Sequence, residues 1–325
     1  MAPPVIVLGV GRSGTTLLRV MLDRHSELAI PYETFFVPQL AHRHRRRPNL
    51  DEFVDDLGRL RTLYDWGIRP ADVRPRLREG MTISEAIAAI FETYADRQGK
   101  SRWGDKTPLY MQQLPLLERL FPDAVWVHLV RDGRDAALSF LELPEGFAGR
   151  TWARPRTVAQ FAARWRTEIL SAQRLGRHAG GRYLELRYED LVAEPERELR
   201  RICEHASLEW ESGMLDHTRV SDAAYMPEHR NLAQPPTPGL RDWRSQMKPE
   251  DALAFEQVAG DVLRSSGYEL LEPGAHYPTP AGRRELARFA VLSRSWNLTA
   301  AAYQRSPLWR RTHPVLGDAD DDGGD

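Results

Sequence analysis

A short apolar run, a glycine-rich turn and an amphipathic segment follow one another near the start of the chain and restrict the fold more than any other feature. Residues 5–10, Val-Ile-Val-Leu-Gly-Val, indicate a buried strand that ends in glycine. Residues 15–23 carry apolar side chains at helical spacing. The turn between them therefore joins a strand to the N-terminus of a helix, where backbone N–H groups and the helix dipole favour an anion.

The same alternation of strands and helices continues along the chain. Residues 124–130 and 182–186 indicate two more buried strands. Helical spacing recurs in several segments, at 50–64, 82–97, 108–120, 133–143, 157–178, 195–206 and 250–266. We therefore predict an α/β fold, a P-loop-type parallel β-sheet with helices on both faces.

Composition excludes several classes of protein. A net charge of −1 provides no basic field for nucleic acid. A single cysteine, Cys203, permits neither an intrachain disulfide nor a cysteine metal cluster. The first residues lack the pattern of a signal peptide, and no apolar run has the length of a membrane helix. These features predict a cytoplasmic protein without a metal site.

The glycine-rich turn departs from the nucleoside-triphosphatase pattern. Gly9 and Gly14 have the spacing of a Walker A loop, but Thr15 stands where that loop has lysine. A triphosphatase would lose its clamp on the terminal phosphates. A cation is present instead inside the loop, as Arg12. The turn alone allows two interpretations, a phosphate loop of another kind or a tight connection without a ligand.

A second candidate anion site lies about 120 residues further on. Arg131 is at the end of a predicted strand, and Ser139 is eight residues later, about two turns into the next helix. Ligands of open α/β sheets bind at this carboxyl edge. The pair therefore predicts a second phosphate site, although a strand-capping arginine and a solvent-facing serine would have the same spacing.

Taken together, these segments resemble the sulfotransferases that use 3′-phosphoadenosine 5′-phosphosulfate (PAPS), with motifs most similar to tyrosylprotein sulfotransferases and bacterial relatives. The resemblance implies sulfonate transfer to a hydroxyl or amine, with PAP as product and no metal. It also implies donor contacts by Gly11, Arg12, Ser13, Gly14, Thr15, Thr16, Arg131, Ser139, Tyr188 and Arg241. The match at Arg241 is partial, because the basic pair that precedes the glycine in cytosolic members is absent.

The expected catalytic set is Arg12, Glu33 and Lys106. Glu33 matches the general base of the tyrosylprotein branch, while His25 is a rival base in this sequence. Lys106 is one of only three lysines and is expected in a loop before a proline-initiated helix. Its compact ammonium could follow a bridging oxygen in transfer. A surface lysine and a glutamate paired with an arginine remain the alternatives.

The chain is expected to divide into a catalytic domain, 1–275, a basic helical extension, 276–316, and a disordered acidic tail, 317–325. Residues 33–100 are expected to form a helical insertion on the acceptor side. The acceptor is expected to be a small molecule, a carbohydrate or a lipid. Residues 279–314, which combine arginines with aromatic side chains, leave open a peripheral membrane contact or a homodimer. Golgi members of the family carry an anchor and disulfides, which this sequence does not show.

Two other functions remain open at this point. A P-loop kinase acting on a small molecule would need magnesium and ATP, and Thr15 argues against it. A non-catalytic nucleotide-binding protein would bind PAP without turnover.

Overall fold

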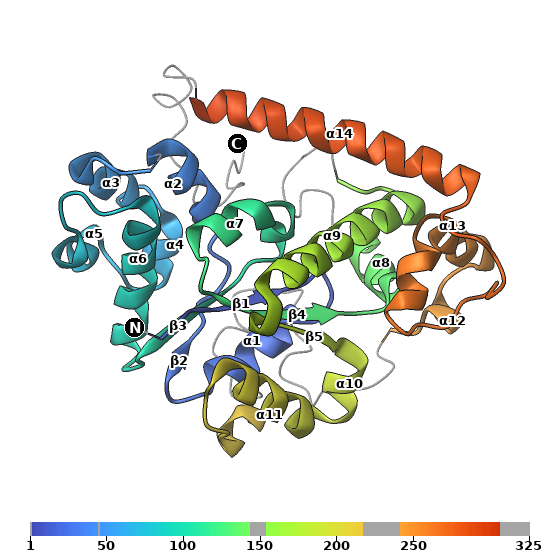
Figure 1. The fold of residues 1–325 in the computed structure, drawn as a ribbon, viewed down its shortest axis with the longest axis horizontal. Helices are drawn as coiled ribbons and strands as arrows, with labels where there is room; N and C mark the ends of the chain where they lie inside the picture. The colour runs from blue at the N-terminus through green and yellow to red at the C-terminus, as the bar shows by residue number, and fades with distance from the viewer. Residues whose placement is uncertain (1, 45, 144–153, 217–240, 306–325) are drawn as a thin grey trace, which may run out of the picture.

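A parallel sheet of five strands forms the centre of the computed structural model, which describes residues 2–44, 46–143, 154–216 and 241–305 (Figure 1). The strand order is β2-β3-β1-β4-β5. The strands are β1 (Val5–Leu8), β2 (Leu28–Ala29), β3 (Arg102–Lys106), β4 (Val125–Val130) and β5 (Tyr183–Arg187). All four neighbouring pairs are parallel, with Val7 opposite both Lys106 and Val127.

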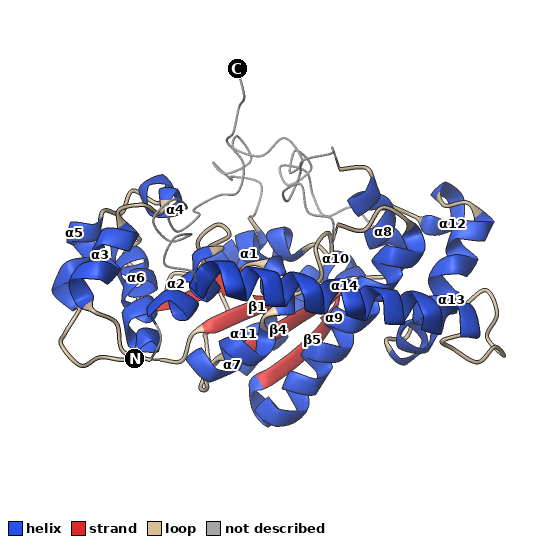
Figure 2. Cartoon of the chain, turned by 90° about the horizontal axis from the view of Figure 1, so that it is seen from above, coloured by secondary structure: helices blue, strands red, loops and turns tan. Residues whose placement is uncertain are grey.

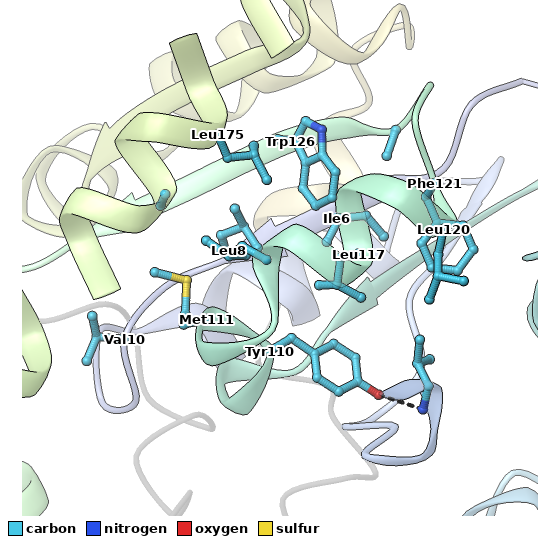
Figure 3. Close-up of a cluster of buried hydrophobic side chains, with 14 of the residues drawn as sticks. Ile6, Leu8, Val10, Tyr110, Met111, Leu117, Leu120, Phe121, Trp126 and Leu175 are labelled. Atoms are coloured by element: carbon cyan, nitrogen blue, oxygen red, sulfur yellow. Dashed lines mark hydrogen bonds between the residues drawn. The ribbon is translucent and has the colours of Figure 1, made fainter. Parts of the chain in front are cut away.

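Alternate residues of β1 enter two different hydrophobic clusters, one on each face of the sheet. Ile6 and Leu8 pack with residues of α7 (Leu114–Leu120) and α9 (Val158–Ala179), and Figure 3 shows them beside Leu117 and Leu175. Val5 and Val7 pack on the other face with α1 (Thr15–Asp23) and α11 (Pro195–Ala206). The predicted α/β fold is thus confirmed: Figure 1 shows α7 and α9 on one side of the strands and α1 and α11 on the other, and Figure 2 shows the strands from above.

Short helices lie between β2 and β3 and pack beside that end of the sheet (Figure 1). They are α2 (Phe36–His44), α3 (Leu50–Leu57), α4 (Arg61–Asp65), α5 (Pro70–Val73) and α6 (Ile83–Arg97). The remaining helices follow the later strands: α8 (Gly133–Leu141), α10 (Tyr188–Ala193), α12 (Trp243–Gln246), α13 (Pro249–Ser265) and α14 (Pro280–Arg305). Helix α14 contacts α9, α13 and α2, and so crosses one side of the molecule.

Strand β3 was not anticipated from the sequence, and the loop expected around Lys106 is a strand that ends at this residue. Its sequence, Arg-Trp-Gly-Asp-Lys, has no apolar alternation, yet all five residues are buried. Gly104 explains the close fit, because a Cβ there would lie 2.5 Å from the carbonyl oxygen of Val5 on β1. Residues 36–44 form a helix inside the segment 33–100, which was expected to be helical.

The division into a domain at 1–275, an extension at 276–316 and a tail at 317–325 stays a prediction. Residues 306–325 lie outside the described residues, and α14 supplies most of the described part of the extension. Among the helices that the structure describes, none has both the length and the apolar character needed to cross a bilayer.

A buried ionic network joins α8 to α13. Arg134 is fully buried, and its Nε and Nη2 donate to the two carboxylate oxygens of Asp132 at 3.0 and 2.7 Å. Its Nη1 donates to Oε1 of Glu256 at 2.7 Å, and Glu256 also accepts from the backbone N–H of Leu271 at 2.9 Å. The network therefore ties the helix that carries Ser139 to the C-terminal helices.

Removing one carboxylate from this network should destabilise the fold. We expect Glu256→Ala to lower the free energy of unfolding by about 3–5 kcal/mol, because the buried Arg134 loses one of its two carboxylate partners and the N–H of Leu271 loses its acceptor. Glu250→Ala, at an exposed position in the first turn of the same helix, should change it by less than about 1 kcal/mol. Urea denaturation measures both; equal losses in the two variants would contradict the assigned role.

Candidate active site

The loop between β1 and α1 has the backbone of an anion-binding turn. Arg12 has φ 73° and Gly14 has φ 88°, and Gly14 is the N-cap of α1. The N–H of Ser13 donates to the carbonyl oxygen of Val10 at 3.0 Å, which closes the turn. Oγ of Ser13 is buried and has no hydrogen-bond partner within the described residues. An anion at the N-terminus of α1 would supply that partner.

Side chains from three strand ends converge on this loop. Nε of Arg12 donates to Oγ of Ser139 on α8 at 3.0 Å. Nη1 of Arg131 donates to the carbonyl oxygen of Arg12 at 3.1 Å, and its guanidinium lies 4.6 Å from the centre of the Tyr188 ring. The same ring covers Gly14, where a Cβ would lie 2.3 Å from it. One cluster thus contains Arg12, Arg131, Ser139 and Tyr188, although Arg12 and Tyr188 are 176 positions apart in the sequence.

Lys106 forms a second cluster on the other side of the loop. Its ammonium is fully buried and donates to Oε1 of Glu33 at 2.7 Å and to Oγ1 of Thr16 at 3.3 Å. It also lies 5.3 Å from the centre of the Tyr32 ring. Burial lowers the pKa of Lys106, and the Glu33 carboxylate opposes that shift. Thr16 therefore connects the phosphate loop with a cation and a carboxylate.

Sheet topology explains why these residues meet. Val7 of β1 is paired with Lys106 of β3, so both strands end at the same edge of the sheet. The loop after β1 then lies beside the end of β3. Such a site can stabilise an anionic leaving group with Lys106 and can accept a proton on the carboxylate of Glu33.

Some candidate residues have other partners. Arg241 pairs with Glu142, with Nη1 and Oε1 2.8 Å apart, rather than with the loop. His25, the rival base, is fully buried, with Nε2 2.8 Å from the carbonyl oxygen of Glu209. Its Nδ1 accepts from the N–H of Glu27 at 3.0 Å, so both ring nitrogens are engaged away from Glu33.

Sequence reasoning missed the residues that surround the pair of Glu33 and Lys106. They are Tyr32, Thr34, Asp105 and Tyr110. The first three are sequence neighbours of Glu33 or Lys106, but nothing in the sequence marks their contacts, and Tyr110 has no such neighbour. In the part of the chain that the structure describes, no three acidic, histidine or cysteine side chains gather as a metal site would require.

Gly14 and Gly11 provide a matched test of the loop geometry. Gly14→Ala should lower the free energy of unfolding by about 1–3 kcal/mol, because φ 88° is strained for alanine and the new Cβ meets the Tyr188 ring. Gly11→Ala should change it by less than about 0.5 kcal/mol, since nothing lies within 4 Å of its Cβ position. Chemical denaturation provides the measurement. Wild-type stability in Gly14→Ala would show that the loop has another conformation.

Comparison with known proteins assigns the chain to a family. The profile of a family described as the sulfotransferase family matches residues 3–212. Protein-tyrosine sulfotransferase A of Caenorhabditis elegans is 27% identical over 285 residues, which cover 85% of this chain and 69% of the relative. Nodulation protein NoeE of Sinorhizobium fredii is 24% identical over 301 residues, with coverages of 81% and 65%.

Solved structures give the same family. The sulfotransferase domain of the Synechococcus PCC 7002 olefin synthase is 26% identical with a TM-score of 0.59, and the match covers 83% of this chain and 97% of that domain. The sulfotransferase domain of the curacin biosynthetic pathway, at 20% identity and a TM-score of 0.56, covers 82% and 99% and shares the fold.

The relatives overturn one expectation. Protein-tyrosine sulfotransferases of Caenorhabditis elegans, Danio rerio, Gallus gallus and Homo sapiens match the chain, and these belong to the Golgi membrane branch of the family. The expected cytoplasmic location is therefore wrong, because it depended on what the sequence lacks rather than on a positive signal. Both the family profile and the relatives identify the chain as a member of the sulfotransferase family, an enzyme that transfers sulfonate groups.

Proposed function

We propose that this enzyme moves a sulfonate group from PAPS to a hydroxyl or amine of its acceptor by in-line transfer, with Glu33 as the general base. The observation that carries the proposal is the position of Lys106. Its buried ammonium contacts Thr16 of the phosphate loop and Glu33 at once. One cation thus lies between the group that would hold the donor and the group that would activate the acceptor.

The donor's two phosphates have separate candidate positions. The 5′-phosphosulfate is proposed to lie at the N-terminus of α1, against residues 11–16 and the orphaned hydroxyl of Ser13. The 3′-phosphate is proposed to lie with Arg131 and Ser139, which the structure connects through Arg12. Tyr188, over Gly14 and beside Arg131, offers a ring for the adenosine. Arg241 is the least supported member of this set, since its guanidinium donates to the carboxylate of Glu142.

The proposed reaction is balanced without another reactant. The acceptor oxygen or nitrogen forms a bond to sulfur while the bond from sulfur to the 5′-phosphate oxygen breaks. The acceptor proton goes to the Glu33 carboxylate, and the bonding electrons go to the phosphate oxygen of PAP. Lys106, Thr16 and Arg12 would stabilise the charge that grows on that oxygen, as preorganised donors do in other transfer enzymes.

The acceptor is proposed to reach Glu33 from the side of helices α2–α6, which follow Glu33 directly in the chain. Small alcohols, carbohydrates and lipids are the acceptor classes that we propose. A tyrosine peptide belongs in the same test, because several relatives carry the name protein-tyrosine sulfotransferase. A membrane contact or a homodimer through 279–314 also stays a proposal, and part of that segment lies outside the described residues.

Nucleotide selectivity tests the donor site. We expect calorimetry to show PAP binding at least about tenfold more tightly than ADP, because ADP lacks the 3′-phosphate that Arg131 and Ser139 would hold. Ser139→Ala should weaken PAP binding and leave ADP binding unchanged. Magnesium should not be needed. ATP binding that is tighter than PAP binding and depends on magnesium would favour a kinase and overturn the proposal.

Turnover with ³⁵S-labelled PAPS and a panel of acceptors tests the chemistry. Glu33→Gln should lower kcat by about 10²–10⁴-fold, since it removes the base but keeps the shape of the side chain. Lys106→Met should lower it by about 10²–10³-fold, since it removes the cation at the leaving group. Lys248→Met, at an exposed residue before α13, is the matched control and should keep wild-type turnover.

Tight PAP binding with no label transferred by any variant or by the wild type would instead support a non-catalytic nucleotide-binding protein. Full activity in Glu33→Gln would assign the base to another group.

A further inference from the structure

Thr34, the residue after Glu33, lies in a buried network of hydroxyl and carboxylate groups. Its Oγ1 is 2.9 Å from Oδ1 of Asp105, 2.6 Å from the hydroxyl of Tyr110 and 3.2 Å from Oγ1 of Thr107. Its backbone N–H donates to Oγ1 of Thr107 at 2.9 Å. Each of these four residues is at most 3% exposed. One threonine is thus held by three side chains from the end of β3 and the 3₁₀ turn after it.

The hydrogen bonds of this network all run toward Asp105. The N–H of Val37 donates to the hydroxyl oxygen of Tyr110 at 3.1 Å, the bond drawn as a dashed line in Figure 3. When Asp105 is ionised its carboxylate only accepts, so the Thr34 hydroxyl then donates to Asp105 and accepts from Tyr110. Thr107 likewise donates to Oδ1 of Asp105, at 3.3 Å. Burial raises the pKa of Asp105 to about 7, against the lowering effect of the hydrogen bonds from Thr34 and Thr107.

These bonds hold a turn at residues 34–36 whose backbone is strained. Phe35 has φ 43°, in the left-handed region that is strained for a bulky residue. The N–H of Phe36 donates back to the carbonyl oxygen of Thr34, which makes a three-residue turn. Contacts from outside the turn must therefore stabilise it, and the side chains of Asp105, Thr107 and Tyr110 supply them.

The network joins the same two segments of the chain as the pair of Glu33 and Lys106. Asp105 is the neighbour of Lys106 on β3, and Thr34 is the neighbour of Glu33. Successive side chains of a strand point to opposite faces, so Asp105 and Lys106 leave β3 on opposite sides. The two segments are thus joined twice, by an ion pair of 2.7 Å on one side and by a hydrogen bond of 2.9 Å on the other.

We propose that Thr34, held by Asp105, Thr107 and Tyr110, is a positioning residue that fixes the Glu33 carboxylate against the Lys106 ammonium. Its meaning for catalysis rests on the function proposed above, but the geometric claim does not. A purely structural role would make Thr34 matter for stability alone. A positioning role makes it matter for the contact between Glu33 and Lys106 in a protein that remains folded.

The pKa of Lys106 reports that contact. Burial lowers it, Glu33 raises it through its charge and hydrogen bond, Arg19 lowers it and Asp105 raises it. Moving the Glu33 carboxylate away would leave the buried ammonium with less support, so its pKa would fall further. Since the sequence has only three lysines, ¹⁵N labelling of lysine gives three Nζ signals to follow by NMR.

The experiment compares Thr34→Val, which removes the hydroxyl and keeps the shape, with Thr34→Ser, which keeps the hydroxyl. Glu33→Gln sets the reference for loss of the carboxylate. We expect the pKa of Lys106 to fall in Thr34→Val and in Glu33→Gln and to keep its wild-type value in Thr34→Ser. The signal of Lys248, which is exposed, should not move in any variant. Thermal unfolding shows which variants are folded at the temperature used.

Where an acceptor has been found, Thr34→Val should lower kcat by about 10- to 100-fold with the KM for PAPS unchanged, because the base is displaced and the donor site is not. Thr34→Ser should restore kcat. Tyr110→Phe, which removes the hydroxyl that donates to Thr34, should shift the pKa of Lys106 in the same direction and replaces Thr34→Val if the latter fails to fold.

A wild-type pKa of Lys106 in folded Thr34→Val or Tyr110→Phe, with a lowered value in Glu33→Gln, would overturn the positioning role. An unchanged pKa in Glu33→Gln would overturn it too, since the contact itself would be absent. These readouts need neither donor nor acceptor. Failure of PAP to bind would count against the proposed function and leave this result standing.

Discussion

Parallel pairing of β1 with β3 is the constraint on which the site depends. It sets Val7 opposite Lys106 and so brings the end of β3 beside the loop that follows β1. The pairing needs Gly104, because the carbonyl oxygen of Val5 lies 2.5 Å from where its Cβ would be. Without this approach, the Lys106 ammonium could not contact Thr16 and Glu33 together. A backbone contact in the sheet thus determines the position of a charged group at its edge.

The two clusters around the phosphate loop differ in how their charge is supported. Arg131 contacts a carbonyl oxygen and an aromatic ring, and Nε of Arg12 donates to a hydroxyl. Lys106 instead has a carboxylate partner, Glu33, in a fully buried position. Breaking such a pair leaves a buried charge without compensation, so the two residues are expected to act as a unit. This difference is what we expect if the first cluster binds phosphate and the second takes part in the transfer, as proposed above.

The fold class and the candidate residues at the two ends of the site could be predicted from the sequence, because the patterns that indicate them are local. The strand, glycine turn and helix at 5–23 have an apolar pattern that hardly allows another structure, as do β4 and α8 with Arg131 and Ser139. Strand β3 was not predicted, because charged residues such as Arg102, Asp105 and Lys106 are usually found at the surface. Sheet pairing and hydrogen bonds bury them here. Thr34 gave no signal, since its partners Asp105 and Tyr110 lie more than 70 positions away in the sequence. Arg241 was placed by analogy alone, and a nearby carboxylate, Glu142, engages it.

If the ammonium of Lys106 lies where the leaving group forms, a crystal structure of the enzyme with PAP will show it. We expect an oxygen of the 5′-phosphate about 3 Å from Nζ of Lys106 and from the N–H groups at the start of α1, with the 3′-phosphate against Arg131 and Ser139. A 5′-phosphate held away from Lys106, or a nucleotide bound in the reverse orientation, would contradict it.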